Sequence, residues 1–306
     1  MRSSPIGRSR AVVVGVTRLA RMPSPLLVVD APSVLYRAFH ALPSKITGAE
    51  GRPVNALLGG VNLVMREVER HEPRAVVMCF GPDAATYRVE AYPAYHAARP
   101  EMPADLRWQW ERSPLLYEAL GWSVELHDEL EADDLLGSFA TVELDAGGEA
   151  LLLTGDRDLW QCVRPGCRVL YMRTGSRGAE VIDEAEVERR YGVPPGLVPD
   201  FIALRGDPSD GLPGAKGIGE KTAAELLSRH GSLEALLHRG APDGTPRVRT
   251  ALEKQAEELR SFRDIATLRH VPLKRPPDRG LDRERGAEAA RSLGMERLAA
   301  RLEGDG

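Results

Sequence analysis

Short apolar runs alternate with longer amphipathic segments from residue 26 to about residue 172. Five runs have the length and composition of single strands: LLVVD (26–30), AVVMCF (75–80), WSVEL (122–126), ALLLTGD (150–156) and RVLYM (168–172). Helical periodicity marks intervening segments such as NALLGGVNLVMREVER (55–70) and EADDLLGSFATVEL (131–144). Strands that alternate with helices predict right-handed βαβ crossovers and a parallel sheet with helices on both faces.

The pattern changes after the fifth predicted strand. Short helical segments separated by Gly and Pro follow from residue 183 to residue 240, and we expect no further strand after residue 172. The sequence therefore predicts an α/β sheet domain over residues 25–180 and a small all-α domain over residues 181–271. Residues 272–306 form a C-terminal extension of unassigned role, with one amphipathic stretch, RGAEAARSLGMERLAARLE.

Composition narrows the class of protein. The chain has 306 residues, of which 42% are hydrophobic, enough for one large core and a smaller second one. A formal net charge of -4 gives no overall attraction to nucleic acid, so binding depends on how charge is distributed. Three cysteines without a CxxC pair argue against a zinc site and favour a reduced, cytoplasmic compartment. Residues 1–24 are basic around a short apolar core, and we expect a flexible tail instead of a signal peptide or membrane anchor.

Carboxylates recur where the predicted strands end or the next helix begins. Six of them occupy such positions: Asp30, Glu131, Asp133, Asp134, Asp156 and Asp158. Because parallel strands end at the same edge of a sheet, we expect these side chains to converge on one crevice. Each acid alone has a structural explanation as a helix cap or first-turn residue. Together they would repel one another strongly unless hard divalent cations, Mg²⁺ or Mn²⁺, lie between them.

Two further acids, Asp207 and Asp210, lie in GDPSDGLPGAKGIGEKTA (206–223) and bring the candidate ligands to eight. Eight carboxylates are more than one ion requires. Two neighbouring ions are the usual arrangement for cutting a phosphodiester, because one activates water and the other stabilises the departing oxygen. The sequence therefore predicts metal-dependent phosphodiester hydrolysis with two ions.

The second half of the same stretch predicts a hairpin that binds phosphate. Its candidate residues are glycines that let the backbone approach an anion, and polar residues beside them at the start of a helix: Gly214, Lys216, Gly217, Gly219, Lys221 and Thr222. An ordinary glycine turn is the alternative, and a nucleotide P-loop fits poorly because GxxxxGK[ST] is not satisfied and no strand precedes it. A helix-hairpin-helix that grips a nucleic-acid backbone without reading its sequence fits best.

Residues 86–110 are unusually aromatic and basic for this chain. Aromatic faces stack on unpaired bases while arginines contact phosphates, so this segment is typical of a surface that holds a single strand. Packing on the core is the alternative, above all for Trp108 and Trp110. We expect Arg88 and Arg99 to contact phosphate, and Tyr36 to stack on a frayed base.

Four stretches together resemble the 5′-to-3′ exonuclease and flap endonuclease family, which includes the amino-terminal domain of bacterial DNA polymerase I. They are VVDAPSVLYRAFHAL (28–42), EADD (131–134), TGDRDL (154–159) and GDPSDGLPGAKGIGEKTA (206–223). The resemblance covers about residues 25–240. It implies a PIN/resolvase-like domain with an arch over the active site, here at about residues 84–115, followed by a helix-three-turn-helix domain.

The resemblance also implies a function and its ligands. By position, Asp30, Glu131, Asp133 and Asp134 match one metal cluster, and Asp156, Asp158, Asp207 and Asp210 match the other. Family hairpins commonly bind K⁺ through the backbone. The implied activity is structure-specific cleavage of DNA at 5′ ends, flaps or duplex/single-strand junctions, in replication and repair. No polymerase domain follows, so we expect a stand-alone nuclease that acts as a monomer.

Two positions depart from the family pattern. Gly81 follows Phe80 where the family has an Asp, and Asp83 is the nearest acid that could replace it. His96 follows Tyr95 where the family has a Lys, and we assign His96, with Arg88, to balancing charge at the attacked phosphate. These departures raise the alternative of a catalytically weakened DNA-binding paralogue. An RNA-cutting PIN enzyme is a second alternative, which the helical hairpin domain disfavours.

Overall fold

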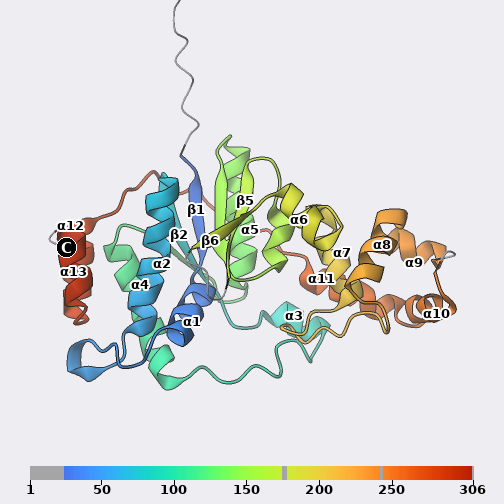
Figure 1. The fold of residues 1–306 in the computed structure, drawn as a ribbon, viewed down its shortest axis with the longest axis horizontal. Helices are drawn as coiled ribbons and strands as arrows, with labels where there is room; N and C mark the ends of the chain where they lie inside the picture. Colours follow the sequence, from blue (N-terminus) through green and yellow to red (C-terminus); the bar gives the residue numbers. More distant parts are fainter. Residues whose placement is uncertain (1–23, 174–177, 242–243, 305–306) are drawn as a thin grey trace, which may run out of the picture.

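The structure is a computed structural model that describes residues 24–173, 178–241 and 244–304. The expected flexible tail, apart from residue 24, lies outside these residues. Figure 1 shows a central sheet with helices on both sides and a group of short helices beyond one edge. No helix in the described part of the chain combines the length and apolar character needed to cross a membrane.

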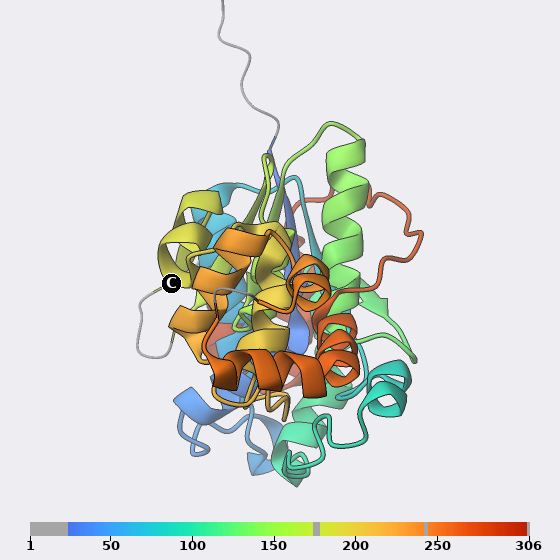
Figure 2. The same ribbon diagram turned by 90° about the vertical axis from the view of Figure 1, so that its right-hand side faces the viewer.

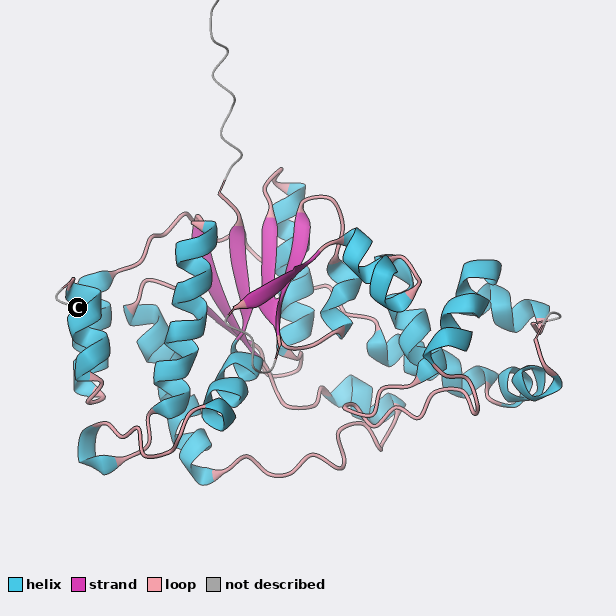
Figure 3. Ribbon diagram, in the orientation of Figure 1, coloured by secondary structure: helices cyan, strands magenta, loops and turns pink. Residues whose placement is uncertain are grey.

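Six strands form one sheet in the order β3-β2-β1-β4-β5-β6 (Figure 3). The strands are β1 (Leu26–Asp30), β2 (Ala75–Phe80), β3 (Ser123–Leu126), β4 (Ala150–Thr154), β5 (Cys167–Met172) and β6 (Ala179–Ile182). The first five are parallel, as the sequence predicts. β6 pairs antiparallel with β5 at the sheet edge, so the expectation of no strand after residue 172 is wrong. β6 has four residues and pairs with one neighbouring strand, so its apolar pattern is too short to be recognised in the sequence.

Helices cover both faces of the sheet because its central strands are apolar throughout: every residue of β1, β2 and β4 is buried. One face packs against α1 (Ala31–Ala41), α2 (Asn55–His71) and α4 (Ala104–Ala119). The other face packs against α5 (Ala132–Asp145), which Figure 2 shows in green alongside the strands. Along the chain, a short helix, α3 (Thr86–Ala91), follows β2 and precedes α4. The α/β class predicted from the sequence is confirmed.

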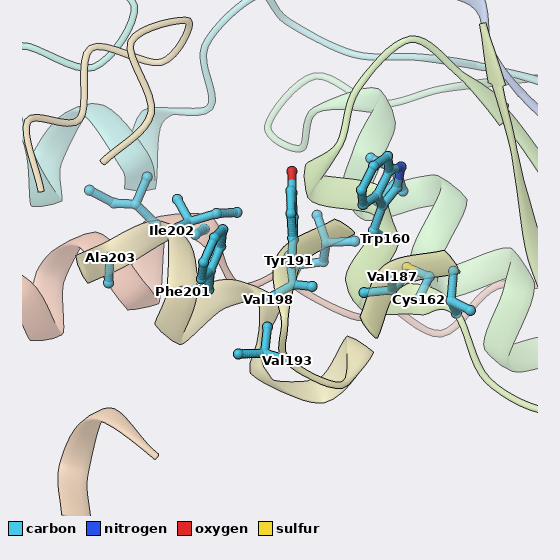
Figure 4. Packing of buried hydrophobic residues seen from close by; sticks show 14 of the residues in the cluster. Trp160, Cys162, Val187, Tyr191, Val193, Val198, Phe201, Ile202 and Ala203 are labelled. Atoms are coloured by element: carbon cyan, nitrogen blue, oxygen red, sulfur yellow. The ribbon is translucent and has the colours of Figure 1, made fainter. Parts of the chain in front are cut away.

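The segment from residue 184 to residue 266 is helical, also as predicted. Its helices are α6 (Glu184–Tyr191), α7 (Val198–Arg205), α8 (Glu220–His230), α9 (Leu233–Arg239), α10 (Pro246–Lys254) and α11 (Ala256–Ala266). An aromatic stack joins them to the sheet: the ring centroids of Trp160 and Tyr191 are 4.8 Å apart, and those of Tyr191 and Phe201 4.6 Å (Figure 4). The helices therefore continue the core that lies on the α5 side of the sheet.

The C-terminal extension folds back onto the opposite side of the sheet. After α11 the chain returns past α5, where Glu143 accepts hydrogen bonds from Arg275 and Arg74. It ends in α12 (Arg283–Ser292) and α13 (Glu296–Glu303), which lie beyond α2 and α4 in Figure 1. Their buried apolar residues belong to the core that contains α2 and α4. The extension is thus an integral part of the first half of the fold.

Candidate active site

The carboxylate of Asp30 is fixed where β1 ends. Its Oδ1 accepts a hydrogen bond of 2.9 Å from the Ser33 backbone N–H and so caps α1. Its Oδ2 accepts one of 2.7 Å from the Thr154 hydroxyl at the end of the neighbouring strand β4. The residue is only 5% exposed. A carboxylate held between two adjacent strand ends cannot move away from the sheet edge.

A cleft of about 580 Å³ lies at this edge, as expected for parallel strands. Six of the eight predicted acids line it: Asp30, Glu131, Asp133, Asp156, Asp158 and Asp210. They come from four separate segments of the chain, which confirms that the acids converge. The lining also includes aromatic and apolar side chains, among them Tyr36, Met102 and Trp110. The cleft therefore offers oxygen ligands for cations and apolar surface for a base or sugar.

The remaining two acids face elsewhere. Asp134 is fully buried, and its carboxylate interacts with Arg88 at 3.1 Å, the Tyr87 hydroxyl at 3.2 Å and the Arg269 backbone N–H at 2.8 Å. Asp207 Oδ1 accepts the Ser209 N–H at 2.8 Å, and its Oδ2 is paired with Arg205 at 3.2 Å. Neither residue lines the cleft. Their assignment to the metal clusters stays a prediction, and their partners give each a structural role.

Burial and mutual repulsion perturb the acids of the cleft. Burial, followed by the charge of Asp210, raises the pKa of Asp156 to about 7. Burial is also the largest cause of the raised pKa values of Asp30, Asp133 and Asp158, and the Asp156 charge is the second cause for Asp133 and Asp158. The carboxylates therefore destabilise one another's ionised form, which is the condition that a bound cation relieves.

The donor set fits a hard divalent ion, because it consists of carboxylate oxygens. Among the described residues, no three Asp, Glu, His or Cys side chains stand close enough to hold an ion directly. The acids line one cleft and raise one another's pKa, an arrangement that suits Mg²⁺ or Mn²⁺, which retain several water ligands. The three cysteines are buried and free, and they contribute to no such group.

Arg88 also lines the cleft and is only 3% exposed. Its guanidinium is 2.8 Å from Glu131 Oε2 and 3.1 Å from Asp134 Oδ1, and its Nε donates to the Ile265 carbonyl at 3.0 Å. All three nitrogens are thus engaged by protein groups. The contact with phosphate predicted for Arg88 stays a prediction, and the geometry gives this residue the role of balancing two buried carboxylates.

His96 occupies the position of the family lysine and faces the acids. Its Nδ1 donates to the Asp83 carbonyl at 2.5 Å, because a carbonyl only accepts, and its Nε2 is 3.1 Å from Asp210 Oδ1. The ring stacks on Tyr95 at a centroid distance of 3.9 Å, and the Tyr95 hydroxyl donates to Glu131 Oε2 at 3.0 Å. His96 and Tyr95 therefore orient acids of the cleft from the arch side.

Gly81 has no room for the family's Asp. A Cβ atom at this position would lie 2.2 Å from the Leu130 carbonyl oxygen and 2.7 Å from Glu131 Cα. Asp83 lies at the mouth of the cleft, where its side chain is 64% exposed and pairs with Arg99 at 3.1 Å. The segment that starts α5 thus fills the space in which the missing side chain would lie.

The predicted hairpin connects α7 to α8. Gly214 needs to be glycine, because its φ is +67° and a Cβ would lie 2.3 Å from the Gly206 nitrogen. Gly219 precedes α8, and no side chain caps the first N–H groups of that helix. Of the other candidates, Thr222 is half-buried and three are exposed: Lys216, Gly217 and Lys221. An exposed hairpin that leads into an uncapped helix start fits the predicted phosphate contact.

Two residues beside the hairpin could not be predicted from the sequence. The Arg247 guanidinium lies over Gly217, with its Nε 2.7 Å from where a Cβ of that glycine would be. Gln255 Oε1 accepts the Lys216 backbone N–H at 2.8 Å. Both come from the region of α10, 24 and 32 residues after the end of the motif, and no local pattern connects them to it.

Comparison with protein families agrees with this geometry. The 5′-3′ exonuclease N-terminal resolvase-like domain matches residues 25–192, and the 5′-3′ exonuclease C-terminal SAM fold matches residues 193–284. The chain belongs to the 5′-3′ exonuclease family. Residues 285–303, which include most of α12 and all of α13, lie beyond both matched regions.

Individual members of the 5′-3′ exonuclease family are similar over most of this chain. A 5′-3′ exonuclease of Mycobacterium tuberculosis (strain ATCC 25618 / H37Rv) is 36% identical over 312 residues, covering 92% of this chain and 98% of that protein. DNA polymerase I of Mycobacterium bovis (strain ATCC BAA-935 / AF2122/97) is 37% identical over 260 residues, which cover 83% of this chain. The match spans only 28% of that polymerase.

Solved structures share the fold of this family member. The T5 5′-exonuclease with bound divalent zinc ions has a TM-score of 0.66 at 15% identity, and covers 92% of this chain and 98% of its own. The bacteriophage T5 flap endonuclease, in a pseudo-enzyme-product complex with DNA and metal ions, has a TM-score of 0.64 at 15% identity, with the same coverage. Both agree with the α/β domain followed by a helical domain.

Proposed function

We propose that this exonuclease family member is a divalent-metal-dependent 5′-3′ exonuclease and 5′-flap endonuclease that cuts DNA in replication and repair. The convergence of six acids from distant segments on one cleft carries the proposal. The T5 relative with bound DNA and metal ions supports the choice of ligands. We further propose that the protein acts as a monomer in the cytoplasm, on DNA with 5′ ends, flaps or duplex/single-strand junctions.

The six acids that line the cleft would divide between two ions. Asp30, Glu131 and Asp133 would hold one ion, and Asp156, Asp158 and Asp210 the other. When bound, Mg²⁺ or Mn²⁺ supplies an activated water and stabilises the leaving 3′ oxygen. The choice between these two ions belongs to the proposal, as does K⁺ at the hairpin.

Residues around the acids prepare the site for a strand. His96 and Tyr95 orient Asp210 and Glu131 through the hydrogen bonds described above. Arg88 holds Glu131 by a buried ion pair and prevents that carboxylate from leaving the cleft. Tyr36, on the apolar wall, provides a face on which an unpaired base can stack. Products with 5′ phosphates are expected.

The hairpin would hold duplex DNA at a distance from the reaction. Exposed Lys216 and Lys221 and the free N–H groups at the start of α8 suit backbone phosphates, and such contacts position DNA without reading its sequence. The alternative of a DNA-binding paralogue retains this grip but lacks cleavage. The test below separates the two.

The test compares cleavage and binding of one 5′-flap DNA, with Mg²⁺ and then with EDTA. Wild-type protein should release 5′-phosphorylated products only with Mg²⁺, and a matched RNA should stay uncut. An Asp156→Asn/Asp158→Asn variant should bind the flap and lose at least about 100-fold in rate, because both acids face the cleft. Asp128→Asn/Glu129→Gln removes the same charge from exposed positions and should cut normally. Binding without cleavage by wild type would favour the paralogue, and cutting of RNA would favour a ribonuclease.

A further inference from the structure

An ion pair between two segments of the chain lies at the mouth of the cleft. Arg99 follows the arch helix α3, and its Nη1 is 3.1 Å from Asp83 Oδ1 in the loop after β2. The same nitrogen donates to the Asp83 carbonyl at 3.5 Å, and Nη2 reaches Asp210 Oδ1 at 3.5 Å. All three residues line the cleft. Arg99 therefore spans from the mouth to the acids inside.

We propose that Asp83 acts as an internal mimic of a DNA phosphate, which occupies Arg99 until an incoming strand displaces it. This inference rests on the proposed function, because it concerns the same cleft. It assigns Asp83 a role opposite to that of a replacement metal ligand, since a ligand promotes cleavage and a mimic opposes strand entry.

The environment of Asp83 separates it from the acids inside the cleft. Asp30, Asp133, Asp156 and Asp158 are shielded from water enough for burial to raise their pKa values. The Asp83 side chain is 64% exposed and has the Arg99 guanidinium as its charged partner. It stays outside the group whose charges require a cation.

The strength of the contact suits displacement. Ion pairs between exposed side chains contribute little net free energy, because water screens them and two flexible side chains must be fixed. The Arg99 side chain is 37% exposed, so its pair with Asp83 belongs near that class. A phosphate offers the planar guanidinium two oxygens and a stronger charge-assisted contact. Asp83 can therefore occupy Arg99 in the free protein and yield it to DNA.

The position of Asp83 follows from the crowding at Gly81. A side chain at residue 81 is excluded by the Leu130 carbonyl, so the loop after β2 places its first acid two residues later, at the mouth of the cleft. There the Asp83 backbone carbonyl also receives the His96 Nδ1–H. Loop and arch are thus joined by two contacts to the Asp83 carbonyl, from His96 and Arg99, and by the side-chain pair of Asp83 and Arg99. Only the side-chain pair competes with phosphate.

The first measurement concerns the protein without DNA. Phenylglyoxal modifies accessible guanidinium groups, and mass spectrometry of the digested protein follows Arg99 separately. Asp83→Asn should make Arg99 react at least about threefold faster, because the amide keeps the size of the side chain but loses its charge. Glu90→Gln removes one charge from an exposed position on α3 and should leave the Arg99 rate unchanged. An equal Arg99 rate in Asp83→Asn and wild type would overturn the proposal.

The second measurement is the Kd for a 5′-flap DNA in EDTA, where cleavage is suppressed. Asp83→Asn should bind about two- to tenfold more tightly, as expected for releasing a partly exposed ion pair. The dependence of log Kd on log salt should also steepen, by up to about one unit, because the Asp83 carboxylate no longer offsets one positive charge beside the bound phosphates. In an Arg99→Ala background the same substitution should have little effect, which a double-mutant cycle measures.

Other results of the DNA-binding and metal-binding measurements would contradict the proposal, each for a different reason. Weaker or unchanged DNA binding by Asp83→Asn would show that Asp83 does not compete with phosphate. A gain that persists in Arg99→Ala would show a general charge effect. Loss of Mn²⁺ binding by Asp83→Asn, measured calorimetrically without DNA, would make Asp83 a metal ligand. If wild-type protein binds no flap DNA at all, the proposed function fails, and the Arg99 reaction rate still decides whether the internal pair exists.

Discussion

The carbonyl oxygen of Leu130 lies where the side chain of residue 81 would begin: a Cβ at Gly81 would be 2.2 Å from it. The backbone that leads into α5 thus approaches the end of β2 as closely as a glycine allows. This contact explains why one departure from the family pattern cannot be reversed by a single substitution.

Gly81→Asp should destabilise the protein and should not increase cleavage. The new Cβ meets backbone atoms of residues 130 to 132, so α5 must shift, at a cost of about 2 kcal/mol or more. Urea unfolding measures the loss. Gly196→Asp is the matched control, because no atom lies within 4 Å of a Cβ there. A stable Gly81→Asp variant with higher activity would contradict the crowding.

Arg88→Met should be among the most destabilising substitutions near the site. It leaves the Glu131 and Asp134 carboxylates buried without their shared cation, which typically costs about 3–5 kcal/mol. The effect should appear as a lower urea midpoint, even in EDTA. Arg107→Met, on exposed α4 surface, should stay within about 0.5 kcal/mol of wild type. Normal stability of Arg88→Met with selective loss of cleavage would instead assign Arg88 to the phosphate.

The metal-free protein should lose stability as pH rises from about 4 to 7. Burial and the Asp210 charge raise the folded-state pKa of Asp156 to about 7, while the unfolded chain titrates near the ordinary value. In this window the folded state binds the extra proton, so the free energy of unfolding falls with pH and levels off above about 7. The free energy of unfolding of the wild type should decrease by on the order of 3 kcal/mol across this window, and Asp156 shares this decrease with the acids that titrate together with it. Asp156→Asn should remove the part that Asp156 contributes.

Urea unfolding in EDTA at several pH values measures this difference. Asp128→Asn, an exposed acid, should follow the wild-type curve. Parallel curves for wild type and Asp156→Asn would show that Asp156 is not forced to hold its proton.

Gly48→Ala should detach the loop between α1 and α2 from the C-terminal helices. A Cβ on Gly48 would lie 2.0 Å from the Leu293 carbonyl, which accepts the Ala49 N–H at 3.0 Å. We expect a loss of about 1–3 kcal/mol in thermal unfolding, with faster proteolysis near residues 43–54. Gly280→Ala, with no atom within 4 Å of its Cβ, should be neutral. Equal behaviour of the two variants would mean that α12 and α13 do not hold this loop.

Arg247→Ala should weaken duplex binding without changing the folded hairpin. Its exposed guanidinium over Gly217 adds a cation to the phosphate-binding surface, so its removal should lower the salt dependence of log Kd by about one unit. Fluorescence anisotropy with duplex DNA in EDTA gives this slope. Arg239→Ala, an exposed arginine at the end of α9, serves as the control. An unchanged slope for Arg247→Ala would remove this residue from the interface.

The elements that could be predicted from the sequence are those whose information is local. Apolar period and turn residues marked the five parallel strands, the short helices and the glycine hairpin, and the strand ends located the acids. β6 was not predicted, because a short edge strand has little periodic pattern in its sequence.

The different roles of neighbouring residues depend on tertiary packing and could not be predicted from the sequence. Asp133 lines the cleft while Asp134 points to Arg88, although the two are adjacent in the first turn of one helix. Gly81 faces Leu130, and Arg247 covers Gly217, across separations that no local pattern spans. The C-terminal helices likewise pack on α2 and α4, far from α11. The physical reason is that periodicity fixes which face of an element is apolar, whereas side-chain partners depend on which distant segments that face packs against.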